Sequence, residues 1–109
     1  MLIGPQNTTL NVNHVRSRIR EAALAAGRDP SAVTLLAVAK TQPAESMRLA
    51  ATAGVTDFGE NYLQEGLAQM DLLTDLELRW HFIGGIQSNK TRAIAERFDW
   101  VHSLDRLSI

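Results

Sequence analysis

Apolar residues recur at helical spacing in the first quarter of the chain and are followed by a short apolar run. Between residues 8 and 26 the recurring apolar positions are Val12, Val15, Ile19, Ala22, Ala23 and Ala26. Their spacing, mostly three or four residues, predicts an amphipathic helix. Gly27 stands where helices commonly end, and Pro30 prevents continuation. Residues 33–39 form an apolar run typical of a strand buried on both faces.

The same strand–helix unit recurs along the rest of the chain. Pro43 suits the first turn of a helix that ends near Gly54. Further strands are predicted at 55–58, 79–83 and 99–102, with helices at about 63–70 and 88–98 between them. Strand–helix alternation at this spacing predicts parallel βα units joined by right-handed crossovers.

Four parallel units after one leading helix fit two α/β architectures. One is a small open doubly wound sheet, and the other is half of an eight-stranded barrel. Both architectures place ligands at the carboxyl ends of the strands. Those ends carry Lys40, Glu60, Asn61, Gly84, Gly85, Gln87, Ser88, Asn89, Lys90, His102 and Ser103, whereas the opposite loops carry ordinary turn residues. A binding site is therefore expected at the carboxyl ends.

Composition narrows the class of protein. The 109 residues are expected to form a single domain over residues 1–109, with 45% hydrophobic and 21% charged residues as in soluble globular proteins. A net charge of −1 gives no basic field for nucleic acid or an anionic membrane. The absence of cysteine excludes disulfides and thiolate chemistry. The sequence contains neither an apolar run of membrane-spanning length nor a signal-peptide pattern, so we expect a cytoplasmic protein.

Lys40 directly follows the first apolar run, in the segment LLAVAKTQP. Burial beside apolar residues lowers the pKa of a lysine and makes its neutral, nucleophilic amine available. Such lysines form Schiff bases with aldehydes, and pyridoxal phosphate is the commonest biological example. Alternatively, the ammonium group reaches solvent or pairs with Glu60. Position alone favours this second interpretation.

The segment GGIQSNKT, residues 84–91, resembles a phosphate-binding loop. It matches the pattern G-x-x-x-x-G-K-[ST] except that Asn89 replaces the second glycine. That glycine is normally needed for the backbone conformation, and no hydrophobic strand ends in an aspartate suited to magnesium. A Gly-Gly turn, with Ser88 capping the helix and Lys90 in solvent, is therefore favoured over a nucleotide site.

The three histidines do not indicate a metal site. His14 is expected on the surface of the first helix, and His81 falls inside the third strand between Trp80 and Phe82. A core histidine with satisfied hydrogen bonds is favoured for His81 over a residue that orients a ligand. No pair of histidines and carboxylates has metal-ligand spacing, so no bound metal is expected.

Four segments together indicate a family. LLAVAKTQPAE, DFGENYLQE, RWHFIGGIQSNKTR and FDWVHSLDRL occur in this order, and the chain closely resembles the pyridoxal phosphate homeostasis proteins from about Val12 to its last residue. These are relatives of the N-terminal barrel domain of alanine racemase. The resemblance implies the N-terminal half of a (β/α)8 barrel with pyridoxal phosphate held as a Schiff base on Lys40. By the same resemblance, Asn61, His81 and Ser103 also belong to the cofactor site.

The resemblance implies a binding function rather than catalysis. Binding, buffering and delivery of pyridoxal phosphate to apoenzymes that use it are expected, without robust turnover. A racemase-like reaction is the alternative, and it needs a second acid–base group. Tyr62, the only tyrosine, is a weak candidate for that group. A nucleotide-binding module through residues 84–91 is the third hypothesis.

Family members are roughly twice as long as this chain. Three explanations are open: a fragment of a longer protein, a short protein that closes a barrel with a second copy, or an open sheet. A half barrel has two bare sheet edges and an uncovered interior. We therefore expect the chain to self-associate.

Overall fold

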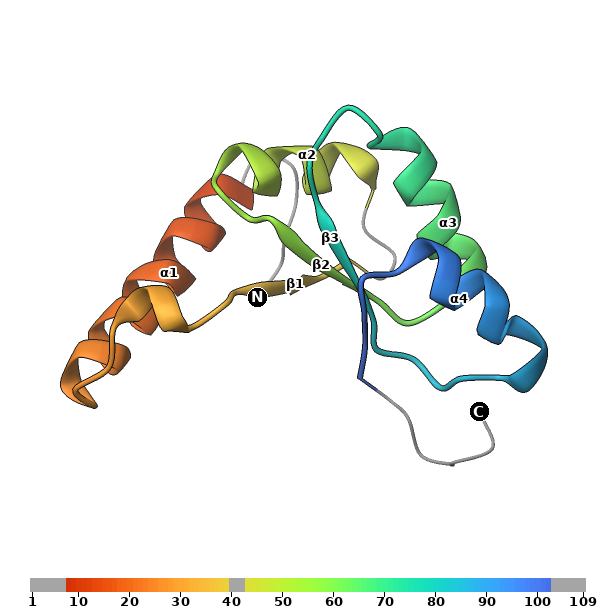
Figure 1. Ribbon diagram of the computed structural model, residues 1–109. Coiled ribbons are helices and arrows are strands. Elements are labelled where there is room, and N and C mark those ends of the chain that lie inside the picture. Colours follow the sequence, from red (N-terminus) through yellow and green to blue (C-terminus); the bar gives the residue numbers. More distant parts are fainter. Residues whose placement is uncertain (1–7, 40–42, 103–109) are drawn as a thin grey trace.

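The computed structural model describes residues 8–39 and 43–102 (Figure 1). In chain order, its elements are helix α1 (Thr8–Ala25), the 3-10 helix η2 (Pro30–Ala32), strand β1 (Leu36–Val38), α2 (Ala44–Thr52), β2 (Asp57–Glu60), α3 (Leu63–Leu72), β3 (Arg79–Phe82), the 3-10 helix η3 (Ser88–Lys90), α4 (Thr91–Arg97) and β4 (Trp100–Val101). The predicted leading helix and the four strand-containing units are therefore confirmed.

The four strands form one parallel sheet in the order β1-β2-β3-β4. Each strand pairs with the next strand along the chain. A doubly wound sheet reverses its strand order at a switch point, whereas a barrel adds its strands in sequence. The observed order is that of four successive units of a (β/α)8 barrel, which decides between the two predicted architectures.

The hydrophobic core lies between one face of the sheet and the helices. Phe58 of β2 and Trp80 and Phe82 of β3 point into it. The rings of Phe58 and Trp80 are 5.7 Å apart, and Phe82 meets Phe98 edge-on at 5.2 Å. The helices contribute Met47, Ala50, Leu63, Met70 and Ile94. Because side chains alternate along a strand, Asp57, Gly59, Arg79 and His81 lie on the opposite face, which turns away from this core.

Helix α1 ends as its sequence predicts. Gly27 has a φ of 74°, in the left-handed region that favours glycine. The N–H of Gly27 donates to Leu24 O at 3.1 Å, and the N–H of Arg28 donates to Ala23 O at 2.8 Å. These bonds satisfy carbonyl groups that the end of the helix would otherwise leave open. The side chain of Arg16 also donates to the Gly54 carbonyl, which ties α1 to the end of α2.

All four strands differ from their predicted ranges; β3 and β4 are each shorter by a residue at one or both ends, and β1 and β2 differ most. Strand β1 begins only at Leu36, because Asp29 caps η2 by accepting a 2.9 Å bond from the N–H of Ser31. Val33, the start of the predicted strand, donates its N–H to Pro30 O instead. Strand β2 spans residues 57–60 rather than 55–58, since Asp57 and Glu60 are accommodated in the sheet despite their charges.

The predicted cap at Ser88 is wrong. Gln87 precedes η3 as its capping residue, without a side-chain hydrogen bond, and Ser88 is the first residue of η3. Helix α4 begins at Thr91, whose Oγ1 donates to Ser88 O at 3.0 Å. The short 3-10 turn therefore takes the place of the first turn of the predicted helix.

Candidate functional site

The carboxyl ends of the strands are partly described. Asn61 follows β2, Ile83 follows β3 and His102 follows β4. Lys40 and Ser103 lie outside the described residues, so what the sequence predicts for them stays a prediction. Two of the four predicted site residues, Asn61 and His81, can therefore be placed.

Asn61 is held in close contact with the loop after β3. The N–H of Ile83 donates to Glu60 O at 2.9 Å, which continues the β2–β3 pairing up to this point. A Cβ atom on Gly84 would lie 2.8 Å from the carbonyl carbon of Asn61 and would overlap its oxygen. Glycine at position 84 thus permits the two loops to pack together, and the half-buried Asn61 is fixed at this edge of the sheet.

His81 lies at the centre of a hydrogen-bonded network on the sheet face opposite the core. Its Nε2 is 2.7 Å from Asp57 Oδ2, and its Nδ1 is 2.8 Å from His102 Nε2. The His81 side chain is only 9% exposed. Both ring nitrogens therefore have partners within the protein, as expected for a satisfied core histidine. Any role of His81 toward a ligand would be exerted through its neighbours.

Asp57 is the anionic end of this network. Its side chain is 3% exposed and accepts hydrogen bonds from Arg79 at 2.8 and 3.0 Å and from Thr56 at 2.8 Å. The hydrogen bond from Arg79, helped by those from His81 and Thr56, outweighs burial and holds the pKa of the Asp57 carboxyl well below its usual value. Asp57 is therefore a carboxylate throughout the physiological pH range.

The aromatic rings on the same face are stacked. The His81 ring lies 5.1 Å from the His102 ring and 6.0 Å from Trp100, with interplanar angles of 21° and 10°. Trp100 is 57% exposed, and His102 is also exposed. The network thus runs from a buried carboxylate to an accessible imidazole.

Glu60 is a buried carboxyl that the sequence patterns did not single out. It is only 1% exposed, and neither of its carboxyl oxygens has a hydrogen-bond partner among the described residues. It lies on the helix side of the sheet, where a Cβ atom on Gly66 would come within 3.1 Å of its Cγ. Burial, with a smaller effect from Glu65, raises its pKa to about 7. Whether Glu60 pairs with Lys40 stays a prediction, because Lys40 lies outside the described residues.

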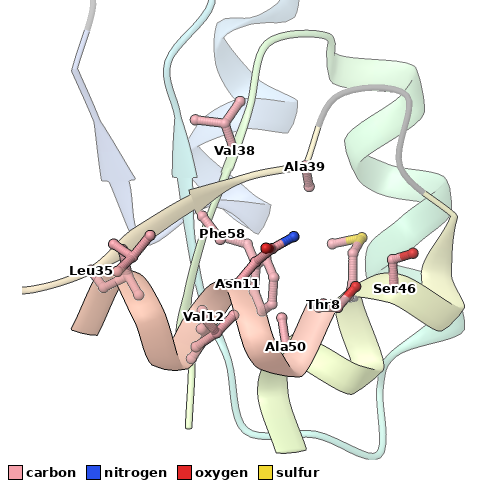
Figure 2. Close-up of a pocket in the computed structure, with 13 residues that line it drawn as sticks. Thr8, Asn11, Val12, Leu35, Val38, Ala39, Ser46, Ala50 and Phe58 are labelled. Carbon is pink, nitrogen blue, oxygen red and sulfur yellow. The ribbon is translucent and has the colours of Figure 1, made fainter. Parts of the chain in front are cut away.

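A separate cavity of about 180 Å³ lies on the helix side of β1, between α1, β1 and α2 (Figure 2). Val12 of α1, Leu35 before β1, Ala50 of α2 and Phe58 of β2 are among the residues around it. The described residues that line it include no ionisable side chain. The cavity lies across the sheet from the network of Asp57 and His81.

The structure does not favour the phosphate-loop hypothesis. Lys90 ends the 3-10 turn and is half-buried, and α4 has only seven residues. Arg92 is 92% exposed and pairs with Glu96 at 2.8 Å. Tyr62, the acid–base candidate of the racemase alternative, stands at the N-cap position of α3 without a side-chain capping bond and is 62% exposed.

Two further classes of feature are not found in the described part of the chain. Within residues 8–39 and 43–102, no set of three or more histidine, aspartate or glutamate side chains is arranged to hold a metal ion. None of the helices in these ranges has the length and hydropathy needed to cross a membrane.

Comparison with proteins of known sequence identifies relatives. No family model matches the chain. The chain is 66% identical over 99 residues to the pyridoxal phosphate homeostasis protein of Pseudomonas aeruginosa and 50% identical over 102 residues to that of Escherichia coli. Over the length that it spans, the chain is a homologue of the pyridoxal phosphate homeostasis proteins. Each match covers 91% of the chain but only 43% and 44% of these relatives, respectively.

Comparison with solved structures leads to the same family. PipY of Synechococcus elongatus superimposes with a TM-score of 0.69 at 48% identity without pyridoxal phosphate, and with a TM-score of 0.68 at 46% identity in its complex with pyridoxal phosphate. These matches cover 82% of the chain and 41% and 42% of PipY. A protein from Bifidobacterium adolescentis that is described as unknown matches with a TM-score of 0.84 at 29% identity, over 95% of the chain and 47% of its own length. The resemblance found in the sequence motifs is confirmed, as is the barrel-type fold.

Proposed function

We propose that the chain is the lysine-bearing part of a pyridoxal phosphate binding protein that acts in homeostasis of this cofactor. The observation that carries the proposal is the likeness to PipY, whose complex holds pyridoxal phosphate, at 46% identity. The names of the relatives describe homeostasis of a cofactor rather than a reaction. We accordingly assign binding, buffering and delivery to this protein, without robust catalysis.

Lys40 is the proposed attachment residue, through a Schiff base. Its position directly after a strand that is held in the sheet supports this role. Ala39, the residue before it, donates its N–H to Gly59 O at 2.9 Å, one step beyond the last paired residue of β1. Lysine therefore follows the carboxyl end of β1, where barrels of this class bind ligands.

The described strand ends fit the chemistry of the cofactor ring. Asn61 offers an amide with both donor and acceptor atoms, and His102 offers an imidazole on the same edge of the sheet. Neutral groups of this kind suit the hydroxyl group and ring nitrogen of pyridoxal phosphate. We propose that Asn61 and Ser103 contact the cofactor directly and that His81 acts through its neighbours. When bound, the cofactor supplies an aldehyde that reacts reversibly with an amine.

Two kinds of protein partner belong to this proposal. Delivery implies transfer of pyridoxal phosphate to apoenzymes that need it. A second copy of the chain is the other partner, because β1 and β4 are the two edges of the described sheet. Exposed strand edges readily pair with another chain.

Trapping of the lysine adduct tests the function. The 109-residue chain is mixed with pyridoxal phosphate, its absorbance is recorded, and the adduct is reduced with borohydride and mapped by mass spectrometry. Selective labelling of Lys40, with loss of the imine absorbance band in Lys40→Ala, is the expected result. Lys90→Ala is the matched control, because Lys90 is the chain's other lysine and free aldehyde also labels accessible amines. Equal labelling of both lysines, unchanged in Lys40→Ala, would contradict the proposal.

A further inference from the structure

The network of Asp57, His81 and His102 determines where the protons lie. Asp57 is ionised and can only accept, so Nε2 of His81, 2.7 Å away, must carry a hydrogen and donate it. In neutral His81, Nδ1 is then the acceptor. Because Nε2 of His102 lies 2.8 Å from this Nδ1, it must in turn donate. Both neutral histidines are thereby fixed as Nε2–H tautomers.

These tautomers leave one ring nitrogen as an open acceptor. Nδ1 of His102 carries a lone pair, and no hydrogen bond from another described residue reaches it. His102 is exposed, unlike His81. A hydrogen bond accepted at this nitrogen leaves unchanged the donation from His102 Nε2–H to His81 and from His81 to the Asp57 carboxylate.

The register of the sheet places His102 at the level of the proposed cofactor site. Glu60 pairs with Phe82, and Phe82 pairs with Val101. Asn61 and His102 each come one residue after these paired positions. The N–H of His102 donates to Phe82 O at 3.0 Å and so fixes its backbone. The accessible imidazole of His102 thus lies, like Asn61, at the carboxyl ends of the strands.

The charged groups around the network carry one net negative charge. Arg79 neutralises Asp57 directly, whereas Asp99 accepts a 2.8 Å bond from the uncharged N–H of Trp80. Asp57 comes from β2, Arg79 and His81 come from β3, and Asp99 comes from the turn before β4. His102 lies on the exposed side of this cluster.

We propose that His102 is the histidine that meets the cofactor, through a hydrogen bond between Nδ1 and a polar group of the pyridine ring, and that His81 and Asp57 are positioning residues behind it. This assignment rests on the proposed cofactor binding. The direct contact to the ligand is then made by His102, which the motif resemblance did not include. His81 does not touch the ligand but holds His102 in position. The relay makes Nδ1 of His102 the hydrogen-bond acceptor of the site.

Two substitutions at position 102 separate the two nitrogens of the ring. Asparagine places its terminal atoms near the position of Nδ1, whereas glutamine reaches the position of Nε2. His102→Asn should therefore keep the ligand contact and lose the bond to His81, and His102→Gln should do the reverse. We expect the affinity for pyridoxal phosphate to fall about threefold to tenfold in His102→Gln, the value of one hydrogen bond, and less in His102→Asn. His14→Gln, an exposed change on α1, is the control.

Nitrogen-15 NMR of the ligand-free chain gives a readout that does not depend on the cofactor. The expected result is the Nε2–H tautomer for both His81 and His102, with loss of the fixed His81 tautomer in Asp57→Asn. An Nδ1–H tautomer at His102 would overturn the proposal. A normal Lys40 adduct with unchanged affinity in His102→Gln would overturn the ligand contact alone. Absence of any selective Lys40 adduct in the unmodified chain would remove the proposed function and the contact together.

Discussion

Gly84 lies so close to Asn61 that a Cβ atom at position 84 would overlap the Asn61 carbonyl oxygen. The neighbouring Gly85 differs, since a Cβ atom there would meet no atom within 4 Å. The two glycines therefore have different roles although they are adjacent in the sequence. Gly84 permits the loop after β3 to pack against the end of β2, where the proposed site lies.

Alanine at these positions tests the difference. Gly84→Ala must displace backbone, so we expect a loss of unfolding free energy of about 1–3 kcal/mol. Gly85→Ala should change it by no more than about 0.5 kcal/mol, because its side chain would point into open space. Urea unfolding of the two variants measures both values. Equal stability of the two variants would show that the loops do not pack as described.

Asp57 should stabilise the protein at neutral pH and lose this effect in acid. Its pKa is lowered in the folded state by the hydrogen bond from Arg79 and then by His81 and Thr56, so the unfolded chain binds a proton more readily. The stabilisation is present above the ordinary aspartate pKa of about 4 and decreases as the pH falls below it. We expect Asp57→Asn to cost about 2 kcal/mol at pH 7 and to flatten the acid dependence.

Asp75 provides the matched control for this measurement. It pairs with Arg48 at 2.6 Å, but its side chain is 61% exposed. Exposed ion pairs contribute little, so Asp75→Asn should leave the stability nearly unchanged. Urea unfolding between pH 2.5 and 7 distinguishes the two variants. A similar acid dependence in the unmodified chain and in Asp57→Asn would contradict the role of Asp57.

Glu60 should make the pH dependence of stability opposite to that caused by Asp57: the protein should become less stable as the pH rises. Burial raises its pKa from 4.5 to about 7 in the folded state, so the folded chain binds this proton more tightly than the unfolded chain. The associated stabilisation is complete below about pH 4.5 and is lost as the pH rises toward 7. The total loss is on the order of 3 kcal/mol.

Glu60→Gln removes this titration. The variant should resemble the unmodified chain near pH 4.5 and be more stable than it above pH 7. Glu65→Gln is the control, because Glu65 makes only the smaller contribution to the raised pKa and most of the dependence should persist. Thermal unfolding at several pH values provides the measurement. If Glu60→Gln lost stability with rising pH as steeply as the unmodified chain, another group would have to be responsible.

Self-association is expected through the sheet edges. Val101 of the edge strand β4 is 42% exposed, and Leu72 of α3 is 63% exposed away from the sheet. A lysine in an edge strand opposes pairing with another chain. Val101→Lys should weaken association about tenfold in sedimentation velocity, whereas Leu72→Lys should not. A monodisperse monomer of the unmodified chain at micromolar concentration would exclude self-association.

Local patterns predicted the elements of this fold well. The spacing of apolar residues gave α1, and Gly27 gave its end with the expected positive φ. The regular spacing of the strands gave the parallel βα units. The motif resemblance then predicted the barrel, whereas periodicity alone did not distinguish it from an open doubly wound sheet. These signals are local or depend on a fixed spacing, so a single sequence contains them.

Local patterns could not predict the partners or the burial of the charged residues within the strands. Asp57 falls inside the predicted strand 55–58, but the pattern does not show that Arg79 balances its charge or that its hydrogen bond to His81 spans 24 residues. His102 joins the same network across 21 residues. Partners this far apart become visible only when the register of the sheet is known. The burial of Glu60 behind the sheet also depends on packing by α3 and Phe98, which come later in the chain.

The strictly sequential order of the sheet has a consequence for how the protein is made. Each described strand after β1 pairs with the strand that precedes it, about 20 residues earlier in synthesis. Domains fold during translation as their segments leave the ribosome, and contacts between nearby segments form fastest. The sheet can therefore grow by one strand at a time on the nascent chain, and each new strand covers the edge that was exposed before it.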